Sequence, residues 1–141
     1  MKTQEKFKSD WGYQFLAPPH WQLQDGKTNS IVDPESGVGA LQISTFEIPS
    51  DQTVDIMDEL LDFVSESKAF NPNEKGQHKN QVVRSNNTAM IELEGRDFRF
   101  HIFWIIFKRP RLLFATYNCK YKDKDIEQEI VKGIASSIEI L

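Results

Sequence analysis

The chain of 141 residues is 39% hydrophobic and 27% charged, and it carries a formal net charge of −4. These values are typical of one soluble globular domain with a core of its own, and they exclude a largely disordered chain. The negative charge argues against nucleic acid as a partner, because phosphate binding needs a concentrated basic surface.

The N-terminal third is predicted to form short strands separated by turns. Trp11, Tyr13 and Phe15 alternate with other residues and so share one face of a first strand. Pro18-Pro19 ends this strand because proline has no N–H group to donate to a sheet. Further strands are predicted at 21–24, 30–32 and 39–48, separated by turns at Asp25-Gly26, Asp33-Pro34 and Ser36-Gly37.

A helix is predicted at 53–67, with Ser50 or Asp51 as its N-cap. Its hydrophobic residues recur at helical spacing and form one stripe: Ile56, Met57, Leu60, Leu61, Phe63 and Val64. The opposite side of the helix is acidic, with Asp55, Asp58, Glu59, Asp62 and Glu66. The polar segment 68–80 follows and is expected to form a long loop.

The second half of the chain is predicted to form an antiparallel meander and a final helix. Strands are expected at 81–84, 88–94, 96–107 and 112–119. The final helix is expected to begin near Asp123 or Asp125, and its isoleucines recur every four residues at Ile126, Ile130, Ile134 and Ile138. Gly133 interrupts this helix, and close packing on the sheet is the expected reason for a glycine there.

The strand at 96–107 indicates how these elements are layered. One of its faces is hydrophobic throughout: Phe98, Phe100, Ile102, Trp104 and Ile106. The other face begins with Asp97, Arg99 and His101 and continues with Phe103, Ile105 and Phe107. A strand is hydrophobic on both faces where both are covered. The pattern therefore predicts an α+β fold, an α/β/α sandwich around a central antiparallel sheet, although a buried homodimer interface would produce the same pattern.

The order of these elements resembles the PsbP-like and Mog-type fold. The resemblance covers nearly the whole chain and is carried by the segments YQFLAPPHWQL, IVDPESG, ALQISTFEI and IASSIEI. The chain is similar to small bacterial proteins of that group whose domain has no assigned function. The resemblance implies the same sandwich and a role in binding another protein rather than in catalysis. No functional residue of those families is carried over to this sequence.

The residue types that perform catalysis or bind metals do not form a recognisable pattern. His20, His78 and His101 are the only histidines, and their spacing predicts no converging set of ligands, so we expect no metal and no cofactor. No serine, histidine and aspartate signature and no glycine-rich loop before a helix is present. Cys119 is expected to be a buried strand residue, with a reactive thiol as the alternative if it is exposed beside lysines.

Two sets of residues are candidates for function. The acidic side of the first helix, Asp55, Asp58, Glu59, Asp62 and Glu66, is either a solvated surface or a docking surface for a basic partner. Arg99, His101 and Trp104 are the candidate lining of a cleft between sheet and helix, with a solvated sheet margin as the alternative.

These features favour a non-enzymatic protein-binding or accessory protein, immunity-like or chaperone-like in role. The alternative is a protein that binds a small ligand or anion in the cleft near Arg99, His101 and Trp104. A cytoplasmic location and no membrane partner are expected, because residues 1–10 lack a signal-peptide pattern and the longest apolar run, 102–107, is too short to cross a bilayer. A single cysteine fits a reducing compartment.

Overall fold

The computed structural model describes residues 4–26, 28–67, 79–85, 87–94 and 99–141. Its helices are α1 (Ile56–Glu66) and α2 (Lys124–Ser136), with a 3-10 turn at Tyr121–Asp123 before α2. Its strands are β1 (Glu5–Ser9), β2 (Tyr13–Ala17), β3 (Gln22–Gln24), β4 (Thr28–Val32), β5 (Gly39–Glu47), β6 (Lys79–Ser85), β7 (Thr88–Glu94), β8 (Arg99–Lys108), β9 (Arg111–Lys120) and β10 (Glu139–Ile140). Most of the predicted loop at 68–80 lies outside the described residues.

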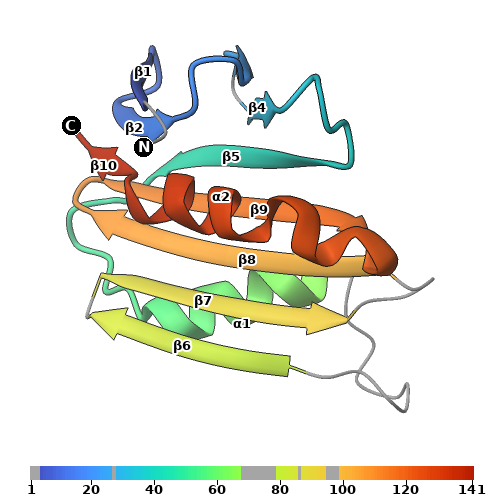
Figure 1. Cartoon of the computed structure of the whole chain (residues 1–141). Coiled ribbons are helices and arrows are strands. Elements are labelled where there is room, and N and C mark those ends of the chain that lie inside the picture. Colours follow the sequence, from blue (N-terminus) through green and yellow to red (C-terminus); the bar gives the residue numbers. More distant parts are fainter. Residues whose placement is uncertain (1–3, 27, 68–78, 86, 95–98) are drawn as a thin grey trace.

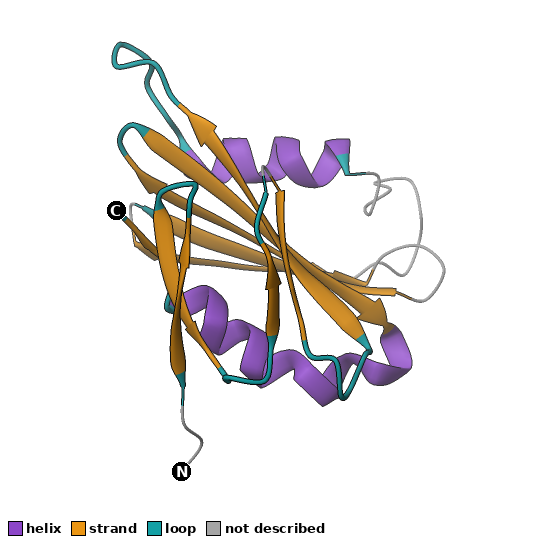
Figure 2. Ribbon diagram, turned by 90° about the horizontal axis from the view of Figure 1, so that it is seen from above, coloured by secondary structure: helices purple, strands orange, loops and turns teal. Residues whose placement is uncertain are grey.

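The strands form two antiparallel sheets. Seven of them are arranged in the order β3-β4-β5-β9-β8-β7-β6, and β1, β2 and β10 form a smaller sheet in the order β1-β2-β10. The two helices lie on opposite faces of the larger sheet (Figures 1 and 2). The predicted α/β/α sandwich around an antiparallel sheet is therefore confirmed.

Two separate hydrophobic cores fill the space between the sheet and the helices. Phe100, Ile102 and Trp104 of β8 pack on the α2 side together with Val131 and Ile134. The intervening strand residues Phe103 and Ile105 pack on the α1 side, with Leu60 and Val64 among their neighbours. Because successive strand residues point to opposite faces, β8 is hydrophobic on both sides along the part that both helices cover.

The structure corrects three details of the N-terminal half. The first strand is β1, which the sequence did not predict, and β2 begins only at Tyr13, so that Trp11 lies in the turn before it and is 43% exposed. Helix α1 begins three residues later than predicted, at Ile56. Its N-cap is Asp55 rather than Ser50 or Asp51, and the Asp55 carboxylate accepts a hydrogen bond from the N–H of Asp58 at 3.1 Å.

Helix α2 also differs from its predicted stripe. Ile126 is 56% exposed and Ile138 lies beyond the end of the helix, whereas the acidic residue Glu127 is buried. No atom outside the helix's own backbone lies within 4 Å of the position that a Cβ on Gly133 would take. The expected close packing of Gly133 is therefore wrong.

Buried Glu127 is held by hydrogen bonds from two other segments. The Tyr117 hydroxyl donates to Oε1 at 2.8 Å, and the Ser36 hydroxyl donates to Oε2. Burial and the bond to Glu127 raise the pKa of Tyr117 above its usual value, so Tyr117 remains a donor at neutral pH. A buried carboxylate needs such partners, and here they join α2 to β9 and to the β4–β5 loop.

Within the described residues, neither helix is long and apolar enough to cross a membrane.

Candidate functional site

The acidic helix surface consists of the five α1 carboxylates predicted from the sequence: Asp55, Asp58, Glu59, Asp62 and Glu66. All are exposed except Glu59, which is half-buried. They occupy the side of α1 that faces away from the sheet, because Ile56, Leu60 and Val64 are buried against it. The structure therefore keeps this set together on one surface.

The charges of this surface are not balanced within the helix. Asp58 and Glu59 lie in the first turn, where the helix dipole favours a negative charge, but Glu66 lies in the last turn, where the dipole disfavours it. The last turn contains no basic residue. In the part of the chain that the structure describes, none of the five carboxylates forms an ion pair. Like charges three or four residues apart destabilise a helix by about a few tenths of a kcal/mol per pair.

An exposed aromatic ring is linked to α1 through two other aromatic rings. Phe46, at the end of β5, is 45% exposed and contacts Phe114 edge to face, with ring centroids 5.7 Å apart. Phe114 in turn stacks on Phe63 of α1, with ring centroids 4.2 Å apart. Glu59 and Glu66 are four and three residues from Phe63, which places them at the edge of the acidic helix surface that is nearer to Phe63. Phe46 is therefore connected to α1 by a chain of ring contacts through Phe114 and Phe63.

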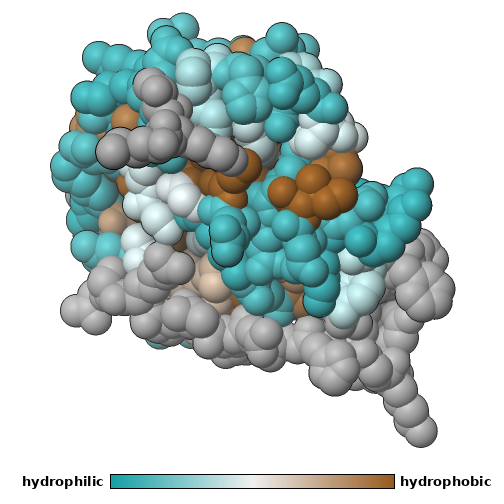
Figure 3. All heavy atoms as spheres, in the orientation of Figure 1, coloured by the Kyte–Doolittle hydropathy of each residue, from teal (hydrophilic) through white to brown (hydrophobic). Residues whose placement is uncertain are grey.

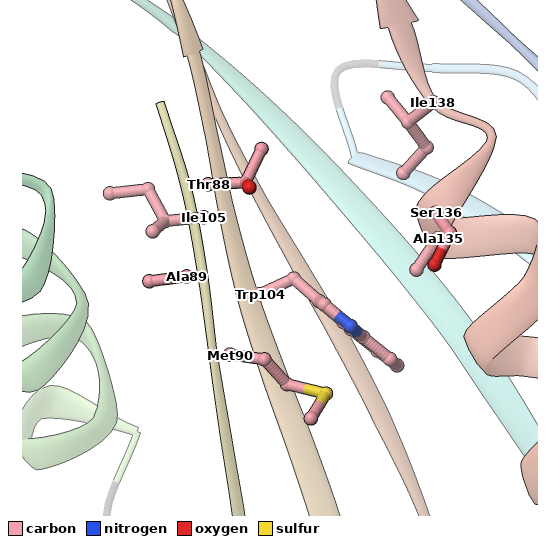
Figure 4. A pocket seen from close by; sticks show the side chains of 8 residues that line it. All are labelled: Thr88, Ala89, Met90, Trp104, Ile105, Ala135, Ser136 and Ile138. Atoms are coloured by element: carbon pink, nitrogen blue, oxygen red, sulfur yellow. The ribbon is translucent and has the colours of Figure 1, made fainter. Parts of the chain in front are cut away.

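The structure divides the second predicted site. His101 stacks on Phe103, with centroids 5.9 Å apart, and both side chains lie on the α1 face of β8. Trp104 lies on the α2 face, in the other core. Figure 4 shows the same alternation on β7 and β8. Ile105 and Ala89 point toward α1, and Trp104 and Met90 point the opposite way. Arg99, His101 and Trp104 cannot line one cleft because the sheet stands between them.

The two polar members of this set differ in charge at neutral pH. Nη2 of Arg99 donates a hydrogen bond to Oδ1 of Asn118 at 2.5 Å, across the β8–β9 pair. Burial, together with the neighbouring Arg99 charge, lowers the pKa of His101 to about 4. His101 is therefore neutral at physiological pH and offers no positive charge to an anion.

Trp104 borders a small cavity on its own face of the sheet. The cavity has a volume of about 90 Å³, and Ala135 and Ser136 of α2 line it together with Ile138, which follows the helix (Figure 4). An apolar cavity of about 150 Å³ holds benzene, so this one is too small for a ligand of ordinary metabolite size.

The surface on the α2 side differs from the acidic helix surface in its charges, because its acidic residues are accompanied by lysines. Most of its visible described residues are hydrophilic, and the hydrophobic ones form separate patches rather than one broad area (Figure 3). Asp125 and Glu129 are exposed on α2 but are accompanied by lysines: Lys124 precedes Asp125, and Lys132 follows Glu129 three residues later. Lys132 also forms an ion pair with Glu92 of β7.

One cluster of potential metal ligands was missed because its members are far apart in the sequence. His20, Asp33 and Glu35 each place one ligand atom within 4.8 Å of those of the other two. His20 precedes β3, and the two acids follow β4. Antiparallel pairing sets Gln22 opposite Val32, so the residues just before β3 and just after β4 meet at one end of the pair.

No family model and no curated protein matches this sequence. Among solved structures, the chain is similar to the cyanobacterial PsbP (CyanoP) of Synechocystis sp. PCC 6803, with a TM-score of 0.73 and 18% identity over 100% of this chain and 94% of that one. It is also similar to a protein of Bacteroides thetaiotaomicron VPI-5482, with a TM-score of 0.61 and 13% identity. The chain covers 49% of that second protein, about half its length. The fold is PsbP-like, and at these identities the likeness is one of fold alone.

Proposed function

We propose that the chain is a non-enzymatic protein-binding protein that docks a basic segment of another protein on the acidic helix surface. An immunity-like or chaperone-like role toward that partner is the concrete form of this proposal. A cytoplasmic location is part of it and rests on composition, since the single Cys119 cannot form an intrachain disulfide.

The observation that carries the proposal is the absence of charge balance on α1. Four exposed carboxylates, at Asp55, Asp58, Asp62 and Glu66, share one surface without an ion pair to any described residue. This arrangement slightly destabilises the isolated helix. A partner with lysines or arginines would remove the repulsion on binding and would be attracted from a distance, which raises the association rate.

The exposed Phe46 ring would add a hydrophobic contact to the proposed docking site. Phe46 is an exposed ring linked to α1 through Phe114 and Phe63, and aromatic side chains are enriched among residues that dominate binding energy. A segment that carries basic and apolar side chains together fits this surface better than a purely basic one.

The test compares the proteins captured by three forms of the chain from a lysate of its own organism. The forms are the wild type, Asp58→Lys/Asp62→Lys on α1 and Asp125→Lys/Glu129→Lys on α2. The two double variants change the net charge equally and place their lysines at the same helical spacing, on exposed residues of opposite faces of the molecule. Quantitative mass spectrometry at low and moderate salt measures the retained proteins.

We expect a protein with a basic segment to be retained by the wild type and the α2 variant and lost by the α1 variant. The difference in retention between the wild type and the α1 variant should become smaller as the salt concentration rises, because screening weakens the electrostatic attraction. An identical set of retained proteins for all three forms would overturn the proposal. A Phe46→Ser variant should weaken retention of the same protein with little dependence on salt.

A further inference from the structure

The end of the β3–β4 pair carries a set of side chains that the proposed function does not use. Nε2 of His20 lies 3.4 Å from Oδ1 of Asp33, and Glu35 adds a second carboxylate within 4.8 Å of both. Imidazole and carboxylate groups are the ligands that zinc takes in proteins when no thiolate is available.

The spacing of the ligand atoms agrees with the size of a zinc ion. Zinc binds histidine nitrogen and carboxylate oxygen at about 2.0–2.2 Å, so two ligands of a tetrahedral site lie about 3.4 Å apart. The His20–Asp33 distance already has this value. Glu35 is exposed, and one of its carboxylate oxygens lies within 4.8 Å of the other two ligand atoms.

The donor groups also suit a divalent cation. The Asp33 carboxylate is oriented by a hydrogen bond that its Oδ1 accepts from the N–H of Glu35 at 2.8 Å. Two carboxylate ligands offset the charge of a divalent ion, and the imidazole adds a nitrogen ligand.

The backbone around the three ligands is held in place by hydrogen bonds that do not use the ligand atoms themselves. The N–H of Gly37 donates to the Asp33 carbonyl at 2.9 Å, and Ser36 is tied to buried Glu127 on α2. On the other side, the N–H of Trp21 donates to the Pro18 carbonyl at 3.0 Å, and the Trp21 ring is buried in the core. The ligands therefore stand on two anchored turns, which reduces the entropy lost on binding.

We propose that His20, Asp33 and Glu35 bind one zinc-class divalent ion, with water as the fourth ligand. The ion would join the turn between β2 and β3 to the loop between β4 and β5 and so would bind the folded chain in preference to the unfolded one. Three protein ligands and one water are the usual arrangement of an open zinc site.

The test is isothermal titration calorimetry of the whole chain with zinc chloride, in a buffer that does not chelate metal. We expect one ion per chain, and at least tenfold weaker binding in His20→Ala and in Glu35→Gln, both of which replace exposed side chains and leave the core unchanged. Glu129→Gln, at an exposed acid on α2, is the matched control and should bind as the wild type does. Magnesium at the same concentration should not compete, because it prefers oxygen ligands and retains its water.

Histidine NMR spectra separate this site from binding elsewhere. On addition of zinc, the ring resonances of His20 should shift, while those of His101, which is stacked on Phe103, should not. Binding that is equally strong in His20→Ala and Glu35→Gln would overturn the proposal, and so would a wild type that binds no zinc at micromolar concentration.

Discussion

Phe103 and Trp104 are neighbours in β8, and their side chains belong to different hydrophobic cores. Phe103 contacts Phe63 of α1 edge to face, with ring centroids 6.0 Å apart. Trp104 points the other way, toward the C-terminal end of α2 (Figure 4). Strand β8 therefore contributes side chains to both hydrophobic cores, and a charge on either face of its central part would be buried.

Ile105→Asp tests the α1 layer. Ile105 is fully buried under α1, so the substitution places an unpaired carboxylate in a hydrophobic core. We expect a loss of about 4 kcal/mol or more, a large part of the stability of a domain of this size, and failure to form a cooperatively folded state. Circular dichroism during thermal unfolding measures this.

Arg99→Ala is the control on the same face of the strand. Arg99 is partly exposed and donates one hydrogen bond to Asn118, so its removal should cost about 1 kcal/mol or less. An Ile105→Asp protein that still melts cooperatively near the wild-type temperature would contradict the two-layer packing.

His101 predicts a loss of stability in mild acid. Its pKa is lowered to about 4 in the folded chain, mainly by burial and further by Arg99, against about 6.5 in an unfolded chain. Between these values the unfolded chain binds a proton that the folded chain does not bind, so stability is highest above pH 6.5 and falls as the pH drops toward 4. One proton gives a slope of at most about 1.4 kcal/mol per pH unit.

Urea unfolding at pH 7 and pH 5 measures this effect. His101→Gln removes the titrating group, so the difference in stability between the two pH values should shrink, whatever the variant's stability at pH 7. Arg99→Gln should shrink it partly, because the neighbouring positive charge is one cause of the lowered pKa. An unchanged difference in His101→Gln would show that another group is responsible.

Gly133→Ala is expected to stabilise the chain. Gly133 is exposed within α2, and the position that its Cβ would take has no neighbour outside the helix's own backbone within 4 Å. Alanine is favoured over glycine inside a helix by about 1 kcal/mol, which should appear in the free energy of unfolding.

Gly39→Ala is the opposite case and serves as the control. A Cβ at Gly39 would lie 2.6 Å from the carbonyl oxygen of Asn118 and 2.8 Å from the Tyr117 ring. We expect this variant to be clearly less stable than the wild type, because a carbonyl in the sheet cannot move away without disturbing the β5–β9 pair. If both alanines destabilise equally, the explanation from local space is wrong.

Periodicity in the sequence was sufficient to predict the layers, because each layer is determined by which faces of a strand or helix are hydrophobic. Phe103 and Ile105 beside Trp104 and Ile106 indicated a sheet covered on both sides, and the structure confirms it. Short elements gave no comparable signal. Strand β10 has two residues, and its pairing with Gln14 and Tyr13 depends on where α2 brings the chain.

The sequence predicted the geometry of one candidate site correctly and that of the other incorrectly, again because of how far each pattern determines which way its side chains point. The acidic helix surface lies within one helix, so the spacing of its residues placed it correctly. Arg99 and Trp104 are an odd number of positions apart on a strand and therefore face opposite ways, a fact that the prediction of a shared cleft overlooked. The approach of His20 to Asp33 follows from the β3–β4 register, which the sequence did not specify.

The acidic helix surface makes a prediction about the isolated chain that does not depend on a partner. Asp62 lies near the middle of α1, with Asp58 and Glu66 four residues away on either side and Glu59 three residues before it. A lysine there would turn three repulsive pairs into attractive ones, each contributing about 0.2–0.5 kcal/mol.

We therefore expect Asp62→Lys to raise the free energy of unfolding by about 0.5–1 kcal/mol at low salt, with a smaller gain at high salt because exposed pairs are screened. Urea unfolding at two salt concentrations measures it. Asp58→Lys is the control, because Asp58 lies in the first turn, where the helix dipole opposes a positive charge and should cancel most of the gain. A loss of more than about 1 kcal/mol in Asp62→Lys would mean that this carboxylate already has a partner within the chain. The acidic helix surface would then be balanced internally, and the argument for a basic partner would lose its basis.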